Sequence, residues 1–379
     1  MTAAADRSGL PAEGTAGVVI ITGASSGIGR CTAGLFARHG WRVGLIARGE
    51  AGLQAACGDV ECQGAMAAMA QADVTEACAL EAAATSIEQA LGPVDVWVNC
   101  AGNGTYGRFL DTPAEEFQRV TDVTYIGTVN GTRVALRRML PRDHGRIVNV
   151  CSAAAFRGMP LLSSYSGAKQ AVRGFGQSVC AELAQDRSRV RLTTIFPPAV
   201  NTPFFEHAIS HMGRPGRPMS PVYQPDIVAD VIHLATMTGR REMSVSFTTV
   251  LFSICVRLVP AVVDRAIRRL GYDGQLCGRT IGPVPHNTTL FTPSDQPSPV
   301  RGAFSAQARS GSVHVRILCA LGRLTGKNRR DPRAGSAAVF RRPMREAASR
   351  ETESRETASA FTEGGVSSAL TPASGPKRA

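Results

Sequence analysis

A tyrosine and a lysine four residues apart, Tyr165 and Lys169, are the residues of this chain best suited to acid–base chemistry. The stretch from Tyr165 to about Gln185 is predicted to be helical, so both side chains share one face, about 6 Å apart along the axis. A free phenol has a pKa of about 10. A nearby cation stabilises the phenolate and lowers this pKa, and each unit of lowering corresponds to about 1.4 kcal/mol. Because Tyr-x-x-x-Lys arises by chance in many helices, its meaning depends on the rest of the chain.

A serine hydroxyl could complete this chemistry. Ser152 follows the apolar run 146–151, which is typical of a buried strand, and precedes Tyr165 by thirteen residues. Its hydroxyl could hold a substrate oxygen while Tyr165 donates or accepts the proton.

A glycine-rich loop near the start of the chain is typical of a phosphate site. Residues 17–21 are apolar and β-branched and predict a buried strand, and the loop Thr22–Gly29 and a helix to about Arg38 follow. This order directs backbone N–H groups and a helix N-terminus at a phosphate. A plain turn would not need Gly23, Gly27 and Gly29 at this spacing.

Strands and helices alternate along the first 246 residues. Further strands are predicted over residues 41–47, 65–70, 94–98, 146–151, 190–196 and 242–246, and further helices over 76–90, 113–140 and 165–185. This alternation predicts an α/β fold, a doubly wound parallel sheet of the Rossmann-like kind in a single domain. Ligands of such sheets lie at the carboxyl ends of the strands, where Gly23 and Ser152 are expected.

The motifs in this order resemble those of the short-chain dehydrogenase/reductase (SDR) family, across about residues 15–245. The matching positions are the Thr22–Gly29 loop, Asp73, Asn99-Cys100-Ala101-Gly102, Ser152, Tyr165, Lys169 and the 197–202 segment. The resemblance implies hydride transfer between a nicotinamide cofactor and a ketone/alcohol pair. Tyr165 would be the general acid/base, Lys169 would bind the nicotinamide ribose and lower the tyrosine pKa, and Ser152 would orient the substrate oxygen.

The resemblance also implies a cofactor-binding set. Asp73 would contact the adenine, and Val200 and Thr202 would hold the carboxamide. The full set is Gly23, Ser25, Ser26, Gly27, Ile28, Gly29, Arg48, Asp73, Val74, Asn99, Ala101, Gly102, Tyr165, Lys169, Pro197, Val200 and Thr202.

Three positions depart from the family pattern. Cys100 replaces the second Asn of Asn-Asn-Ala-Gly, and Pro198 replaces a glycine beside the nicotinamide. The third is Thr124, at the place of an asparagine that holds a water in a proton relay to the lysine. A threonine hydroxyl donates and accepts but is shorter and stiffer, so Thr124 is interpreted as a catalytic relay variant.

The residue after the second strand bears on cofactor choice. An acid there would accept hydrogen bonds from a ribose 2′-hydroxyl, whereas an arginine suits a 2′-phosphate. Arg48 holds this position and no acid follows until Glu50, which favours NADP(H) over NAD(H). The alternative is that Arg48 only caps the strand in solvent.

Composition narrows the remaining possibilities. The chain has a net charge of +12, and residues 301–379 account for most of it, with 15 Lys/Arg against 6 Asp/Glu. Because the positive charge belongs mainly to the tail and not to the globular part, a nucleic-acid partner is not expected. The ten cysteines form no Cys-x-x-Cys pair, which favours reduced thiols in a cytoplasmic protein and no metal site. The longest apolar stretch, 245–263, is broken by Arg257 and Pro260, so no integral membrane span is expected. It is either a membrane contact or a packed strand and helix.

Four regions are therefore expected: a disordered N-terminus (1–15), a Rossmann-fold dehydrogenase domain (16–246), an extension packing on it or covering the cleft (247–290), and a basic, mostly disordered tail (291–379). Within the tail, residues 313–321 form an apolar patch that could be a docking helix. The resemblance implies a homo-oligomer, paired through the helices that begin near Pro113 and Tyr165.

Two other functions remain open from the sequence. One is a non-catalytic NADP(H)-binding sensor or scaffold with a basic interaction tail, favoured by Thr124 and Pro198 and opposed by the intact Ser152, Tyr165 and Lys169. The other is a dehydratase or epimerase on the same fold, which would show no net redox change.

Overall fold

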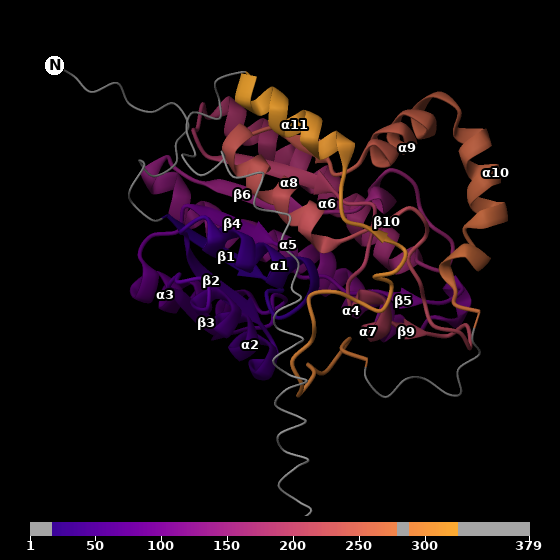
Figure 1. The fold of residues 1–379 in the computed structure, drawn as a ribbon, viewed down its shortest axis with the longest axis horizontal. Helices are drawn as coiled ribbons and strands as arrows, with labels where there is room; N and C mark the ends of the chain where they lie inside the picture. Colours follow the sequence, from indigo (N-terminus) through magenta and orange to yellow (C-terminus); the bar gives the residue numbers. More distant parts are fainter. Residues whose placement is uncertain (1–16, 279–287, 325–379) are drawn as a thin grey trace, which may run out of the picture. The chain divides into compact units, whose positions relative to one another are not determined.

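A seven-stranded parallel sheet forms the centre of the protein (Figure 1). The computed structural model describes residues 17–278 and 288–324, all within the first of two compact units, residues 1–328. The strand order is β11-β7-β6-β4-β1-β2-β3, and every neighbouring pair is parallel. This confirms the predicted doubly wound α/β fold. The strands are β1 (Val18–Thr22), β2 (Arg42–Ala47), β3 (Ala67–Gln71), β4 (Val96–Asn99), β6 (Arg146–Val150), β7 (Arg191–Phe196) and β11 (Glu242–Ser244).

Helices cover both faces of the sheet because its strands are apolar on both sides. In β1, Val19 and Ile21 pack toward one helical layer, and Val18 and Ile20 toward the other. The first layer contains α1 (Gly27–Arg38), α2 (Glu50–Glu61) and α8 (Pro225–Thr238), and the second contains α3 (Ala77–Leu91), α5 (Gly127–Met139) and α6 (Ser163–Gln185). Neither α2 nor α8 was predicted from the sequence.

The long helix predicted over residues 113–140 is interrupted. It divides into α4 (Ala114–Thr121), a π-helical turn η2 (Asp122–Ile126) and α5. π-helical turns inside helices occur frequently at functional sites. Thr124, the relay variant proposed from the sequence, lies in this turn.

Short elements surround the carboxyl ends of the strands. Two small parallel sheets form there, β12-β10-β8 and β5-β9. Their strands are β5 (Thr105–Tyr106), β8 (Ala199–Val200), β9 (Ile209–Ser210), β10 (Val222–Tyr223) and β12 (Ala308–Arg309), and the short helices are η1 (Phe109–Asp111), η4 (Ala153–Ala155), α7 (Phe204–His207) and η5 (Asp273–Gln275). A further short helix, η3 (Leu140–Arg142), lies at the opposite end of the sheet, before β6.

The region after β11 is ordered further than predicted. Helices α9 (Phe247–Leu258) and α10 (Pro260–Leu270) are followed by residues 288–304, named the strap here, then β12 and α11 (Val313–Leu324). Disorder from residue 291 onward is therefore wrong for 291–324, because backbone pairing of β12 with β10 and the packing of Val315 into the core hold this part. Residues 325–379 lie outside the described part of the chain. No helix among the described residues is long and apolar enough to cross a membrane.

Candidate active site

The end of β6 and the start of α6 bring Ser152 and Tyr165 together. The chain leaves the sheet after Val150, and Ser152 caps η4 by accepting the N–H of Ala154 at 3.1 Å. Helix α6 begins at Ser163, so Tyr165 lies in its first turn and forms a hydrogen bond with Ser152. The predicted juxtaposition of the two hydroxyls is thus present.

Lys169 lies one turn further along α6, buried beside Tyr165. Its Nζ is 5.6 Å from the centre of the Tyr165 ring and donates a hydrogen bond to the backbone oxygen of Val150 at 2.8 Å. The ammonium group has three N–H donors. One of them anchors the lysine to the end of β6, and the others can serve a ligand in the cleft.

Burial dominates the acid–base properties of this pair. It raises the pKa of Tyr165 above that of a free phenol, and the hydrogen bond with Ser152 opposes only part of the rise. Burial also lowers the pKa of Lys169. The direction is opposite to the lowering expected from the sequence, because burial disfavours the charged phenolate. Tyr165 is a protonated donor at neutral pH.

Thr124 is less free to relay a proton than the sequence suggested. Its Oγ1 donates to the backbone oxygen of Asn103 and accepts the Asn103 N–H, each at 3.3 Å. Thr124 is fully buried and is not among the residues that line the cleft, whereas Asn103 is. Both side-chain polar atoms of Asn103 are buried without a hydrogen-bond partner among the described residues. Such groups are rare and commonly bind water or serve a functional role. Asn103 was missed because its only sequence signal is its position after Gly102.

The glycine loop is built for close backbone approach. Gly23 and Gly27 have left-handed backbones, at φ 66° and 51°. A Cβ built on Gly29 would lie 2.2 Å from the backbone oxygen of Gly23, so only glycine fits there. A cavity of about 630 Å³ extends from this loop to Tyr165, Ser152 and Lys169. These residues fit a dinucleotide, with phosphates at the N-terminus of α1 and the reacting ring at the tyrosine.

Of the cofactor-binding set predicted from the sequence, all members except Asn99 line this cavity. Asn99 is buried and fully engaged: its amide donates to Thr132 and Asn149, at 3.0 and 2.8 Å, and its oxygen accepts the indole N–H of Trp97 at 2.7 Å. The structure therefore gives Asn99 the strand-supporting position and not the predicted cofactor contact.

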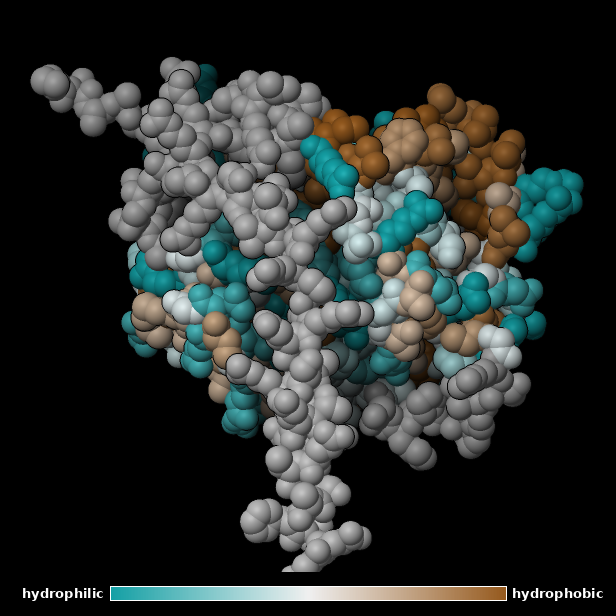
Figure 2. All heavy atoms as spheres, viewed as in Figure 1, coloured by the Kyte–Doolittle hydropathy of each residue, from teal (hydrophilic) through white to brown (hydrophobic). Residues whose placement is uncertain are grey.

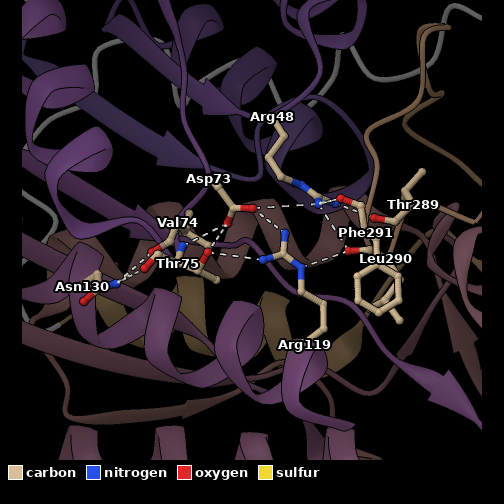
Figure 3. A network of polar contacts seen from close by, with 9 residues as sticks. All are labelled: Arg48, Asp73, Val74, Thr75, Arg119, Asn130, Thr289, Leu290 and Phe291. Atoms are coloured by element: carbon tan, nitrogen blue, oxygen red, sulfur yellow. Dashed lines mark hydrogen bonds and ion pairs between the residues drawn. The ribbon is translucent and has the colours of Figure 1, made fainter. Parts of the chain in front are cut away.

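The other end of the cavity is positively charged around one carboxylate (Figure 3). Asp73 accepts hydrogen bonds from the N–H and hydroxyl of Thr75, at 3.0 and 2.9 Å, and forms an ion pair with Arg119. Arg48 lies 3.9 Å from the same carboxylate. Burial tends to raise the pKa of Asp73, but the hydrogen bonds from Arg119 and Thr75 outweigh it and leave the pKa below its ordinary value. Burial and the charge of Arg119 lower the pKa of Arg48.

Arg48 does not merely cap its strand in solvent. Its guanidinium donates to the backbone oxygens of Leu290 and Phe291, at 3.3 and 2.8 Å, and of Thr289 (Figure 3). It thereby fixes the first residues of the strap beside the carboxyl end of β2.

The strap forms an outer wall of the cavity, which the sequence did not predict. The backbone oxygen of Pro299 accepts the Gly27 N–H at 3.3 Å, and that of Ser298 accepts from Arg30 at 3.0 Å. Six described residues of the strap line the cavity: Thr289, Leu290, Pro293, Ser294, Gln296 and Ser298. The contacts of the strap with Arg48, Arg30 and Gly27 are made by its backbone carbonyls, which any residue type carries, so its sequence gives no signal for them. Side chains also hold it, through the ion pair of Arg301 with Asp226 and the ring contact of Phe304 with Phe205.

The substrate end of the cavity is apolar. The ring centres of Phe204 and Tyr165 are 5.4 Å apart, and Phe205 also lines the space. These phenylalanines lie on α7, in the connection between β8 and β10. His211, on the same segment, pairs with Glu116 at 2.9 Å, and the described residues contain no cluster of ligands suited to a metal.

Comparison with known proteins agrees with this site. The family model for short chain dehydrogenases matches residues 17–213. The oxidoreductase YxnA of Bacillus subtilis is 32% identical over 70% of this chain and 75% of its own length. The 3-dehydrosphinganine reductase of Danio rerio is 33% identical over 49% of this chain and 57% of its own.

Among solved structures, an alcohol dehydrogenase from Thermococcus sibiricus complexed with 5-hydroxy-NADP superposes with a TM-score of 0.54. It is 27% identical and covers 61% of this chain and 96% of its own. The glycine loop, the Ser152, Tyr165 and Lys169 group and these matches agree. The chain is therefore an NAD(P)-dependent oxidoreductase of the short-chain dehydrogenase/reductase family.

Proposed function

We propose that this protein reduces the carbonyl group of an apolar ketone with NADP(H), with Tyr165 as the proton donor. The observation that carries the proposal is that one continuous cavity joins the glycine loop to Ser152 and Tyr165. The hydrogen bond between Tyr165 and Ser152 supports it as well, because it holds the phenol where it could give its proton to a developing alkoxide.

Each residue has a defined part in this proposal. When bound, the nicotinamide supplies the hydride. Ser152 and Tyr165 hold the substrate oxygen from two sides, and Lys169 stabilises the phenolate left after proton transfer. Aromatic and aliphatic side chains that line the cavity, among them Phe204, Phe205 and Phe252, exclude water from the reacting carbon.

The first test is oxidation of NADPH and NADH by the full chain over a panel of aliphatic, aromatic and long-chain ketones. Turnover with NADPH supports the proposal. Tight nucleotide binding with no turnover on any member of the panel would contradict it and favour a nucleotide sensor. Turnover without net redox change would indicate a dehydratase or epimerase.

The preference for NADP(H) rests on Arg48. We expect Arg48→Ala to weaken NADPH binding by about tenfold or more, the effect of losing a charge-assisted hydrogen bond to the 2′-phosphate. NADH binding should change much less, so fluorescence titration with both nucleotides measures the ratio.

Arg30→Ala is the matched control, because Arg30 also anchors the strap, at Ser298, but lies on α1 and not after β2. It should change the two affinities equally. An unchanged NADPH-to-NADH affinity ratio in the Arg48 variant would contradict the preference.

Asn103 is proposed to position the water that returns a proton to Lys169, in place of Thr124. We expect Asn103→Ala to lower kcat by about tenfold with little change in KM, because the amide does not touch the apolar part of the substrate. Adding Thr124→Asn should restore part of kcat by presenting an amide from η2. Equal loss in the single and double variants, or a parallel loss of thermal stability, would indicate a purely structural role.

A further inference from the structure

Helices α9 and α10 carry an apolar surface that faces away from the sheet. Figure 2 shows hydrophobic side chains gathered over these two helices. Sixteen large hydrophobic side chains are exposed among the described residues, and seven of them fall within residues 247–270: Phe247, Leu251, Ile254, Leu258, Val259, Val262 and Leu270, at 44 to 75% exposure. These seven residues are named the α9–α10 surface. Single exposed hydrophobic residues need no explanation, but a contiguous patch marks an interaction site.

The sequence spacing makes this surface continuous. Phe247, Leu251, Ile254 and Leu258 recur every three to four residues and share one face of α9. Thr249 is the only buried residue of α9, and Val263 is the only buried residue of α10. The two helices therefore add little to the core of the domain, although most residues of α9 are apolar.

The charged side chains of α9 and α10 are almost all positive. Arg257 lies in the last turn of α9, and Arg265, Arg268 and Arg269 lie on α10. The one acid, Asp264, is paired with Arg157 at 2.7 Å. A two-fold contact through this surface would bring both sets of arginines into one interface, where the one acid of each copy is already paired with Arg157. An anionic lipid surface instead attracts both parts, because it offers acyl chains to the apolar side chains and phosphates to the arginines.

We propose that the α9–α10 surface docks the protein on an anionic bilayer, without spanning it, and that the cleft opens onto this surface. Phe252 of α9 and Ile267 of α10 line the cavity from inside. Leu270 lines the cavity and is also 65% exposed, so the mouth of the cavity adjoins the docking surface. This second part rests on the proposed function: an apolar ketone dissolved in the bilayer would enter the cleft past Leu270.

The test is co-sedimentation of the full chain with vesicles of phosphatidylcholine alone or with about one third phosphatidylserine. We expect binding to the anionic vesicles that weakens as salt is added, because the arginines are screened. Leu258→Asp combined with Val262→Asp should lower the bound fraction at least tenfold, since both side chains leave water on docking. Arg268→Gln should lower partitioning by about fivefold. Met66→Asp is the control, because Met66 is 58% exposed on another part of the surface, and it should bind like the wild type.

Failure of this proposal can be read separately from failure of the proposed function. Neither Leu258 nor Val262 lines the cavity, so the double variant should turn over a water-soluble ketone as the wild type does. A wild type that turns over ketones but ignores anionic vesicles would overturn the docking proposal. A second result would also overturn it. If the wild type is a dimer in light scattering and does not bind vesicles, and the double variant is a monomer, then a second copy of the chain covers the surface.

Discussion

Tyr165→Phe is expected to lower kcat for ketone reduction by about 10²- to 10⁴-fold, the range that a positioned general acid supplies. The variant keeps the ring, and with it the packing on Phe204, but lacks the hydroxyl that bonds to Ser152. Single-turnover absorbance of NADPH measures the loss. NADPH affinity should change by less than about threefold, because the variant leaves the glycine loop proposed for the phosphates unchanged.

The pH dependence distinguishes proton donation from a binding role. Because burial raises the pKa of Tyr165, the phenol stays protonated through neutrality, and the wild-type rate of reduction should be flat from about pH 6 to pH 9 and fall only above that. The remaining activity of Tyr165→Phe should not fall at alkaline pH, because the variant has no phenol to deprotonate.

Tyr125→Phe is the matched control, since Tyr125 packs against Phe175 and does not line the cavity. It should retain wild-type activity. If kcat falls equally in both variants, the effect of Tyr165→Phe comes from a disturbed fold and not from the loss of the proton donor.

Gly29→Ala should abolish tight nucleotide binding and destabilise the domain. The new Cβ would lie 2.2 Å from the backbone oxygen of Gly23, so the loop must move away from the N-terminus of α1. We expect NADPH affinity to fall by more than about tenfold and the free energy of unfolding to fall by about 1–3 kcal/mol, as for other overpacked sites. Fluorescence titration and urea denaturation measure the two effects.

Gly34→Ala provides the control on the same helix. A Cβ there meets only the far end of the Arg38 side chain, at 3.7 Å, and replacing glycine within a helix gains roughly 0.5–1 kcal/mol. This variant should bind NADPH normally and be slightly more stable than the wild type. Normal nucleotide binding by Gly29→Ala would show that the glycine loop is not the phosphate site.

The sheet could be predicted from the sequence because its strands are short, apolar runs bounded by loops. β1, β2, β6 and β7 each fall within about one residue of the predicted range. The catalytic positions followed from the same logic, since parallel strands place their carboxyl ends at one edge. Helix α8 was not predicted, although Asp226, Asp230 and His233 recur at helical spacing and Pro225 and Gly239 mark its two ends.

The sequence by itself determined the fold class, the glycine loop and the grouping of Ser152, Tyr165 and Lys169, because each depends on local patterns and on parallel-strand topology. Only the tertiary structure decided the rest. Burial sets the direction of the Tyr165 pKa shift, backbone hydrogen bonds engage Thr124, and backbone oxygens hold the strap against Arg48 and Gly27. Desolvation and backbone hydrogen bonding between distant segments depend on where the chain folds, and side-chain patterns do not record them.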